Sequence, residues 1–242
     1  MGFLALYGLS NLTPFGQRAE NLLLDGTSDQ TLIFEMYQTG LIPALSLEYE
    51  TLAVGLGAAV LIAAWRRRRR DLATVVVATP VAVYSTRIFK DAAPRPDIVD
   101  AISGLTERSY PSGHFAVAAA VSMALLIVVP RTWLRWLAPM LLIWTSAIGA
   151  AVLTLMWHRP SDVVGGALLV AAVFLLVGAV FSKTSWEQER AWRPSVPVVV
   201  VGVAITIASA WRDPHTWTVP FSVVTTLVAT AFLGYVAQRC RE

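Results

Sequence analysis

Residues 158–181 read HRPSDVVGGALLVAAVFLLVGAVF, a short polar cluster followed directly by a long apolar run. The run from 162 to 181 has the length of about 20 residues that a helix needs to cross a bilayer. Charged groups at the edge of a span are costly to keep near lipid, so they indicate a functional site by default. The stretch predicts a membrane-spanning helix that begins with chemically active side chains.

Apolar stretches recur along the 242-residue chain, which is 56% hydrophobic and only 14% charged. A typical soluble domain carries about 25% charged residues, so the composition indicates an integral membrane protein. We predict an all-α fold, a polytopic transmembrane helical bundle. Its candidate spans are 47–65, 72–89, 113–130, 136–157, 162–181, 195–211 and 219–237.

The arginines at 66–70 join the first two spans, and the positive-inside rule places them in the cytoplasm. Alternating from there puts the later groups of basic residues beside the spans on the same side. It sends 90–112 and 158–161 outward. Three polar clusters therefore share the outer face: KDAAPRP at 90–96, PSGH at 111–114 and HRPSD at 158–162. The basic residues read as membrane anchors, so we expect no nucleic-acid partner.

The chain divides into three regions. Residues 1–46 form an N-terminal amphipathic segment, which fits an interfacial helix, a poorly ordered tail or part of a longer span. Residues 47–181 form the transmembrane core, and 182–242 contribute two additional helices and a short cytoplasmic tail. The single cysteine, Cys240, excludes an internal disulfide framework and a cysteine-based zinc site.

The PSGH cluster opens a helix. The first turn of a helix offers free N–H groups and the positive end of its dipole, a suitable place for an anion. A phosphate there could accept hydrogen bonds from the amides and from the Ser112 hydroxyl, with Gly113 allowing close approach and His114 facing it. The alternative is a plain helix cap beside an exposed histidine.

The other two clusters supply complementary groups. His158 and Asp162 are four residues apart, a spacing at which a carboxylate can hold an imidazole in one tautomer. Asp162 would also suit a helix cap, and both roles are compatible. Lys90 and Arg95 supply positive charge of the kinds that hold phosphate oxygens.

In this order the clusters resemble the signature of the type-2 phosphatidic acid phosphatases, the integral-membrane lipid phosphate phosphatases. That signature is a Lys, six residues and Arg-Pro; then Pro-Ser-Gly-His; then Ser-Arg, five residues, His, three residues and Asp. The chain matches it at Arg95-Pro96, at 111–114, and at His158 with Asp162. The resemblance covers about 47–181 and implies a lipid phosphate phosphatase-like core.

The resemblance also implies roles for single residues. His158 would attack phosphorus and form a phosphohistidine, with Asp162 orienting it. His114 would protonate the leaving oxygen and then activate water. The residues that would bind the phosphate oxygens are Lys90, Arg95, Ser112 and Gly113. Family members need no metal, so we expect no metal and no other cofactor.

Two positions depart from the signature. The expected lysine falls on Ile88, so Lys90 or Arg87 would have to replace it, and we favour Lys90 because its long stem can reach. The expected arginine falls on Val152. Arg159 is a candidate substitute for that arginine, although it does not occupy a position of the signature.

The predicted activity is hydrolysis of the phosphate or pyrophosphate of a membrane lipid at the outer face of a plasma membrane, which suits a bacterial cell. Candidate substrates are an isoprenoid pyrophosphate, phosphatidic acid and phosphatidylglycerol phosphate; neither the choice among them nor the oligomeric state follows from the sequence. The main alternative is a weakened relative that binds lipid phosphates. A small proton-relay transporter would place ionisable groups in mid-span, whereas here they gather at the ends of the spans. The soluble vanadium haloperoxidases share the signature, but seven apolar spans argue against that class.

Overall fold

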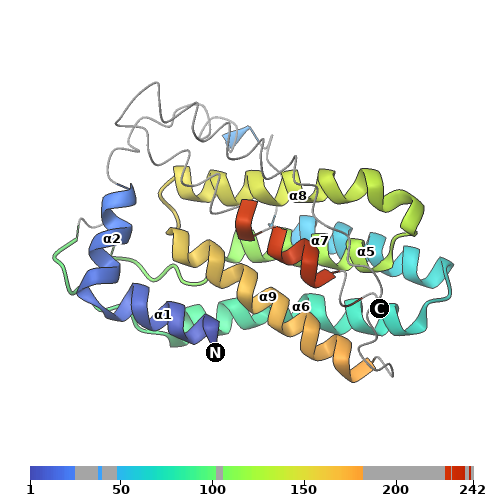
Figure 1. The fold of residues 1–242 in the computed structure, drawn as a ribbon, viewed down its shortest axis with the longest axis horizontal. Helices are drawn as coiled ribbons and strands as arrows, with labels where there is room; N and C mark the ends of the chain where they lie inside the picture. Colours follow the sequence, from blue (N-terminus) through green and yellow to red (C-terminus); the bar gives the residue numbers. More distant parts are fainter. Residues whose placement is uncertain are drawn as a thin grey trace.

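The computed structural model describes residues 1–24, 38–39, 48–101, 106–181, 227–229, 231–237 and 240. Its helices are α1 (Gly2–Leu12), α2 (Pro14–Leu24), α5 (Glu48–Trp65), α6 (Arg69–Ala92), α7 (Gly113–Val128), α8 (Arg131–Thr154) and α9 (Pro160–Phe181) (Figure 1). The described residues contain no strand. The prediction of an all-α transmembrane bundle is confirmed.

Helices α5, α6, α8 and α9 are long and apolar enough to cross a membrane, and α7 is a shorter apolar helix. Each matches a predicted span to within a few residues. The largest difference is in α8, which begins at Arg131 and ends at Thr154 rather than running from 136 to 157. The predicted span 195–211 lies outside the described residues, as do 219–226 and 230 of the predicted span 219–237; the described residues of that last span are helical.

Helix α7 is the centre of the bundle. It packs against α5, α6, α8 and α9, and its side chains from Phe115 to Ala124 are all buried. Alanines at 116 and 118–120 let the neighbouring helices approach closely, as small residues do between membrane helices. The first turn of α7 is therefore surrounded by the ends of its neighbours.

The two ends of the bundle differ in chemistry. At one end, Arg66 donates to the backbone oxygen of Val128 and so caps the last turn of α7. At the other end lie the last turn of α6, the first turn of α7 and the α8–α9 connection (Figure 1). Because these three segments carry the three polar clusters, the fold gathers them at one end.

Helices α1 and α2 form a hairpin that covers this polar end (Figure 1). Its crossing is tight: a Cβ on Gly16 would meet the backbone oxygen of Leu9 at 2.0 Å, so any larger residue would force the helices apart. The hairpin buries polar side chains and exposes Leu4, Leu9 and Phe15. This polarity is the reverse of the pattern for a helix on the surface of a soluble protein.

Candidate active site

His158 is placed by the way α8 ends. Met156 adopts a positive φ of 56°, and the amides of Trp157 and His158 both donate to the backbone oxygen of Val152, each at 3.1 Å. Together with the bond from the Met156 amide to Leu153, this is a Schellman turn, which satisfies the last carbonyls of a helix. The turn brings the His158 side chain back toward the bundle, where it is only 4% exposed.

Asp162 organises the turn that follows. Its Oδ2 lies 3.3 Å from His158 Nδ1 and accepts the backbone amide of Arg159 at 2.8 Å. An aspartate on Nδ1 favours the tautomer that carries its lone pair on Nε2. Burial lowers the pKa of His158, against the opposing effect of Asp162, and this shift favours the neutral imidazole.

A cavity of about 520 Å³ opens beside this pair. His158 and His114 both line it, and the centroids of their rings are 6.1 Å apart. Its full lining is Lys90, Glu107, Arg108, Ser109, His114, Leu155, Met156, Trp157, His158 and Arg159. Two imidazoles, one from the first turn of α7 and one from the α8–α9 connection, therefore face one space that also holds cationic side chains, an arrangement suited to an anionic reactant.

Arg159 is the most firmly held of these cations. Its Nη1 donates to Ser109 Oγ at 2.6 Å and lies 3.5 Å from the backbone oxygen of Glu107, and the residue is 3% exposed. Burial lowers the pKa of Arg159 while Asp162 raises it, and a guanidinium remains charged. A fixed guanidinium beside the two imidazoles could bind phosphate oxygens.

Comparison with known protein families gave one match. The model of the PAP2 superfamily matches residues 71–187. This region belongs to the PAP2 superfamily. No curated protein and no solved structure gave a significant match. Members of the superfamily are phosphatases, so the general activity is hydrolysis of a phosphoric ester. The apolar helices place the PAP2 region in a lipid bilayer as part of a multi-pass membrane protein.

The structure distinguishes the two candidates for the missing PAP2 lysine. Ile88, at the expected position, is 67% exposed on the outside of α6. Lys90 lines the cavity, whereas Arg87 points to α5, where it pairs with Glu48 at 3.1 Å and donates to the Tyr49 hydroxyl. Lys90 is thus the one of the two cations that lines the cavity, and phosphate binding by Lys90 stays a prediction.

At the position where the PAP2 signature has an arginine, this chain has Val152. Val152 is fully buried in α8, and its carbonyl is occupied by the turn described above. Arg159 reaches the cavity from the other side of that turn. The position of Arg159 is compatible with the substitution considered from the sequence.

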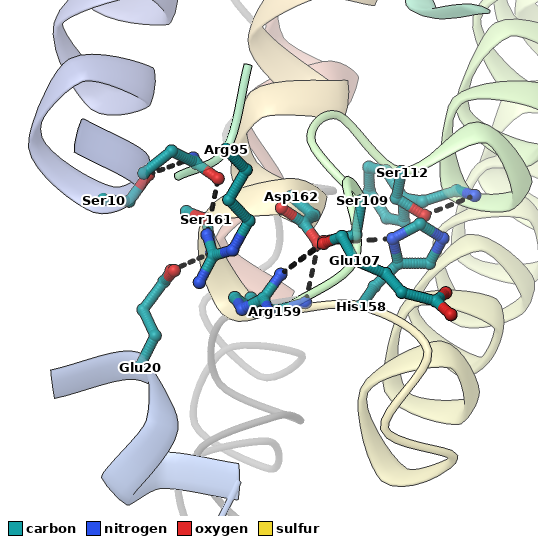
Figure 2. A network of polar contacts seen from close by, with 12 residues as sticks. Ser10, Glu20, Arg95, Glu107, Ser109, Ser112, His158, Arg159, Ser161 and Asp162 are labelled. Atoms are coloured by element: carbon teal, nitrogen blue, oxygen red, sulfur yellow. Dashed lines mark hydrogen bonds and ion pairs between the residues drawn. The ribbon is translucent and has the colours of Figure 1, made fainter. Parts of the chain in front are cut away.

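Arg95 lies apart from this cavity. Its Nη1 bonds Asn11 Oδ1 at 2.6 Å, and it is not among the cavity-lining residues. In Figure 2 Arg95 stands on the side of Glu20, with Asp162 and Arg159 between it and His158. Burial, with Arg159 adding to the effect, lowers the pKa of Arg95 to about 10. Phosphate binding by Arg95 stays a prediction.

Ser112 and Gly113 hold the start of α7. Ser112 is fully buried; its hydroxyl accepts the amide of Phe115 at 3.4 Å, and its own amide donates to the backbone oxygen of Asp162 at 3.0 Å. A Cβ on Gly113 would make only ordinary contact, 3.7 Å from Glu48. Ser112 thus caps α7 and joins it to α9, and it is not among the cavity-lining residues; phosphate binding by Ser112 and Gly113 stays a prediction.

Two groups were not found by sequence reasoning. Ser109, which holds Arg159, adjoins the PSGH cluster but lacks a recognisable spacing. Glu20 Oε1 accepts a hydrogen bond from the Ser161 amide at 3.0 Å. The two residues are 141 positions apart, so no local sequence pattern predicts the contact. Among the described residues there is no group of three or more His, Cys, Asp or Glu side chains placed to hold a metal ion.

Proposed function

We propose that the protein hydrolyses the phosphate or pyrophosphate of a membrane lipid through a phosphohistidine on His158. The observation that carries the proposal is that His158, paired with Asp162, lines one cavity together with His114 at the polar end of an apolar bundle. Membership of a phosphatase superfamily supports the reaction, and the surrounding spans favour a substrate that stays in lipid.

The proposed reaction has two steps. His158 Nε2 attacks phosphorus, the bond from phosphorus to the leaving oxygen breaks, and His114 donates a proton to that oxygen. His114 then removes a proton from water, whose oxygen attacks phosphorus and releases His158. Lys90 and Arg159 stabilise the negative charge on the oxygens that do not react. The net products are a lipid alcohol, or a lipid monophosphate, and inorganic phosphate.

Phosphate release from lipids by the purified full chain tests the function. Phosphatidic acid, phosphatidylglycerol phosphate and an isoprenoid pyrophosphate would be compared at equal surface concentration. Release from one of them supports the proposal and names the lipid class. Lipid binding without phosphate release would instead favour a catalytically weakened relative. This alternative is considered because Val152 stands where the signature has an arginine.

Lys90 and Arg87 should separate in the same assay. Lys90→Ala is expected to lower kcat/KM about 10- to 100-fold, the usual size of a lost charged hydrogen bond. Arg87→Ala is expected to change kcat/KM less than about threefold, since Arg87 points away from the cavity and its pair with Glu48 is partly open to solvent. A larger loss in Arg87→Ala than in Lys90→Ala would reverse the assignment.

We propose that the site opens on the outer face of the plasma membrane, because the arginines at 66–70 lie at the opposite end of the bundle. In a Cys240→Ser background, an impermeant thiol reagent added to intact cells should label Asp97→Cys and spare Arg70→Cys. The reverse labelling pattern would place the site in the cytoplasm.

We also propose that the α1–α2 hairpin, which lies in the 1–46 region, rests in the same leaflet. Its exposed Leu4, Leu9 and Phe15 support this, because lipid is the environment that favours them. In the same labelling assay, Leu9→Cys should resist the aqueous reagent, whereas Arg18→Cys should react. Equal labelling of both would indicate a hairpin surrounded by water.

A further inference from the structure

The hairpin turns its polar side chains toward the loops that frame the site. Asn11, Gln17 and Glu20 are buried, and each contacts a different part of that frame. Asn11 holds Arg95, as described above. Gln17 donates to the backbone oxygen of Pro96 at 2.7 Å and accepts the amide of Ile98 at 3.2 Å. Such inward polar groups suggest that the hairpin does more than cover the bundle end.

Glu20 makes the contact nearest to the proposed chemistry. Its Oε1 accepts the amide of Ser161 at 3.0 Å, and Glu20 itself is 7% exposed. Ser161 is the second residue of α9, where backbone amides have no partner inside the helix. Glu20 therefore supplies, from α2, the cap that the first turn of α9 needs (Figure 2).

That turn carries the partner of the proposed nucleophile. Asp162 follows Ser161 directly, and its Oδ2 contacts His158 at 3.3 Å. Movement of the turn would move this carboxylate, and small errors in the placement of a reacting group can reduce rates strongly. The contact chain from Glu20 through Ser161 and Asp162 to His158 spans α2, α9 and the α8–α9 connection.

We propose that Glu20 is a positioning residue of the phosphatase site, fixing the first turn of α9 and thereby the placement of Asp162 against His158. The inference rests on the proposed function. Glu20 touches no reacting atom in it and acts through the backbone of Ser161.

The contact with Ser161 depends on an acceptor oxygen more than on charge. The ionisable groups around Glu20 are Arg95, Tyr110, Arg159 and Asp162. Burial, with Asp162 adding to the effect, raises the pKa of Glu20 to about 7, so neutral and ionised forms coexist at neutral pH. Both forms present an acceptor to the Ser161 amide, and a glutamine at this position would do the same.

The test compares two conservative substitutions. Glu20→Gln keeps the acceptor at its distance, and we expect its kcat to stay within about threefold of the original chain. Glu20→Asp keeps the charge but withdraws the acceptor by one methylene, and we expect kcat to fall at least tenfold with KM changed less than twofold. Arg18→Gln, exposed on the same helix, is the matched control and should change neither constant.

Three results would overturn the inference: an unchanged kcat in Glu20→Asp, a loss in Glu20→Gln as large as in Glu20→Asp, or a Glu20→Asp defect in KM alone. A second readout does not need activity. Amide hydrogen exchange across 161–164 should quicken in Glu20→Asp and remain slow in Glu20→Gln. If the original chain releases no phosphate, the proposed function fails, and the exchange measurement alone decides the role of Glu20.

Discussion

Replacing His158 with glutamine is expected to reduce phosphate release at least a thousandfold, roughly the scale seen when a covalent nucleophile is removed. The reason is geometric: His158 presents a neutral imidazole that Asp162 holds at Nδ1, and no other side chain duplicates that arrangement in the cavity-lining set. Glutamine keeps most of the volume of the buried ring, so the loss should not come from a collapsed core.

The His158 prediction has a direct chemical readout. Brief incubation with labelled substrate followed by alkaline quench should trap an acid-labile phosphoprotein in the original chain and none in His158→Gln. His114→Ala is the informative comparison, because it should still form the phosphoprotein from a substrate with a good leaving group but release phosphate slowly. A His158→Gln protein that turns over normally would exclude the phosphohistidine mechanism.

Replacing Arg159 with alanine should cause the second-largest loss, about 30- to 1000-fold in kcat/KM, which corresponds to roughly 2–4 kcal/mol of transition-state stabilisation. Arg159 is buried in the cavity wall and fixed by Ser109, so its guanidinium is already ordered when an anion arrives. Arg159→Lys should recover only part of the loss, because an ammonium lacks the planar fork of donors.

Two control variants test whether the expected loss is specific to Arg159 or follows from removing any positive charge. Arg135 is exposed on α8 over the Trp136 ring, and Arg135→Ala should leave kcat/KM within about twofold. Ser109→Ala removes the hydrogen bond that holds Arg159 and should give a smaller loss than Arg159→Ala. If Arg159→Ala turns over like the original chain, Arg159 is not required to stabilise the negative charge on the phosphate oxygens.

The helices were predictable because lipid imposes a simple rule on the chain. A span needs about 20 apolar residues, so the lengths of the apolar stretches located α5, α6, α7, α8 and α9. The end of α8 was the exception. The apolar run continues past Thr154, but the Schellman turn stops the helix there, and Met156 in place of the usual glycine gives no sequence signal.

The sequence predicted which residue types belong to the site better than it predicted how they are arranged in space. The spacing of four predicted that His158 lies beside Asp162, and the two are in contact although His158 precedes α9, because the Asp162 carboxylate also accepts the Arg159 amide and so folds residues 158–162 into a turn. Arg87 and Lys90 both lie near the end of α6, and only the rotation of that helix in the bundle turns one toward α5 and the other toward the cavity. Helix rotation follows from packing against neighbours, which a single sequence does not display.

The sequence by itself determined the membrane-spanning class, the common face of the polar clusters and the histidines with their aspartate, since hydropathy, charge alternation and helical spacing are local properties. The tertiary structure alone decided which cations line the cavity, and it turned the polar side of the N-terminal hairpin inward onto Arg95 and Ser161. These contacts join segments more than 80 residues apart, so they depend on the simultaneous packing of the helices.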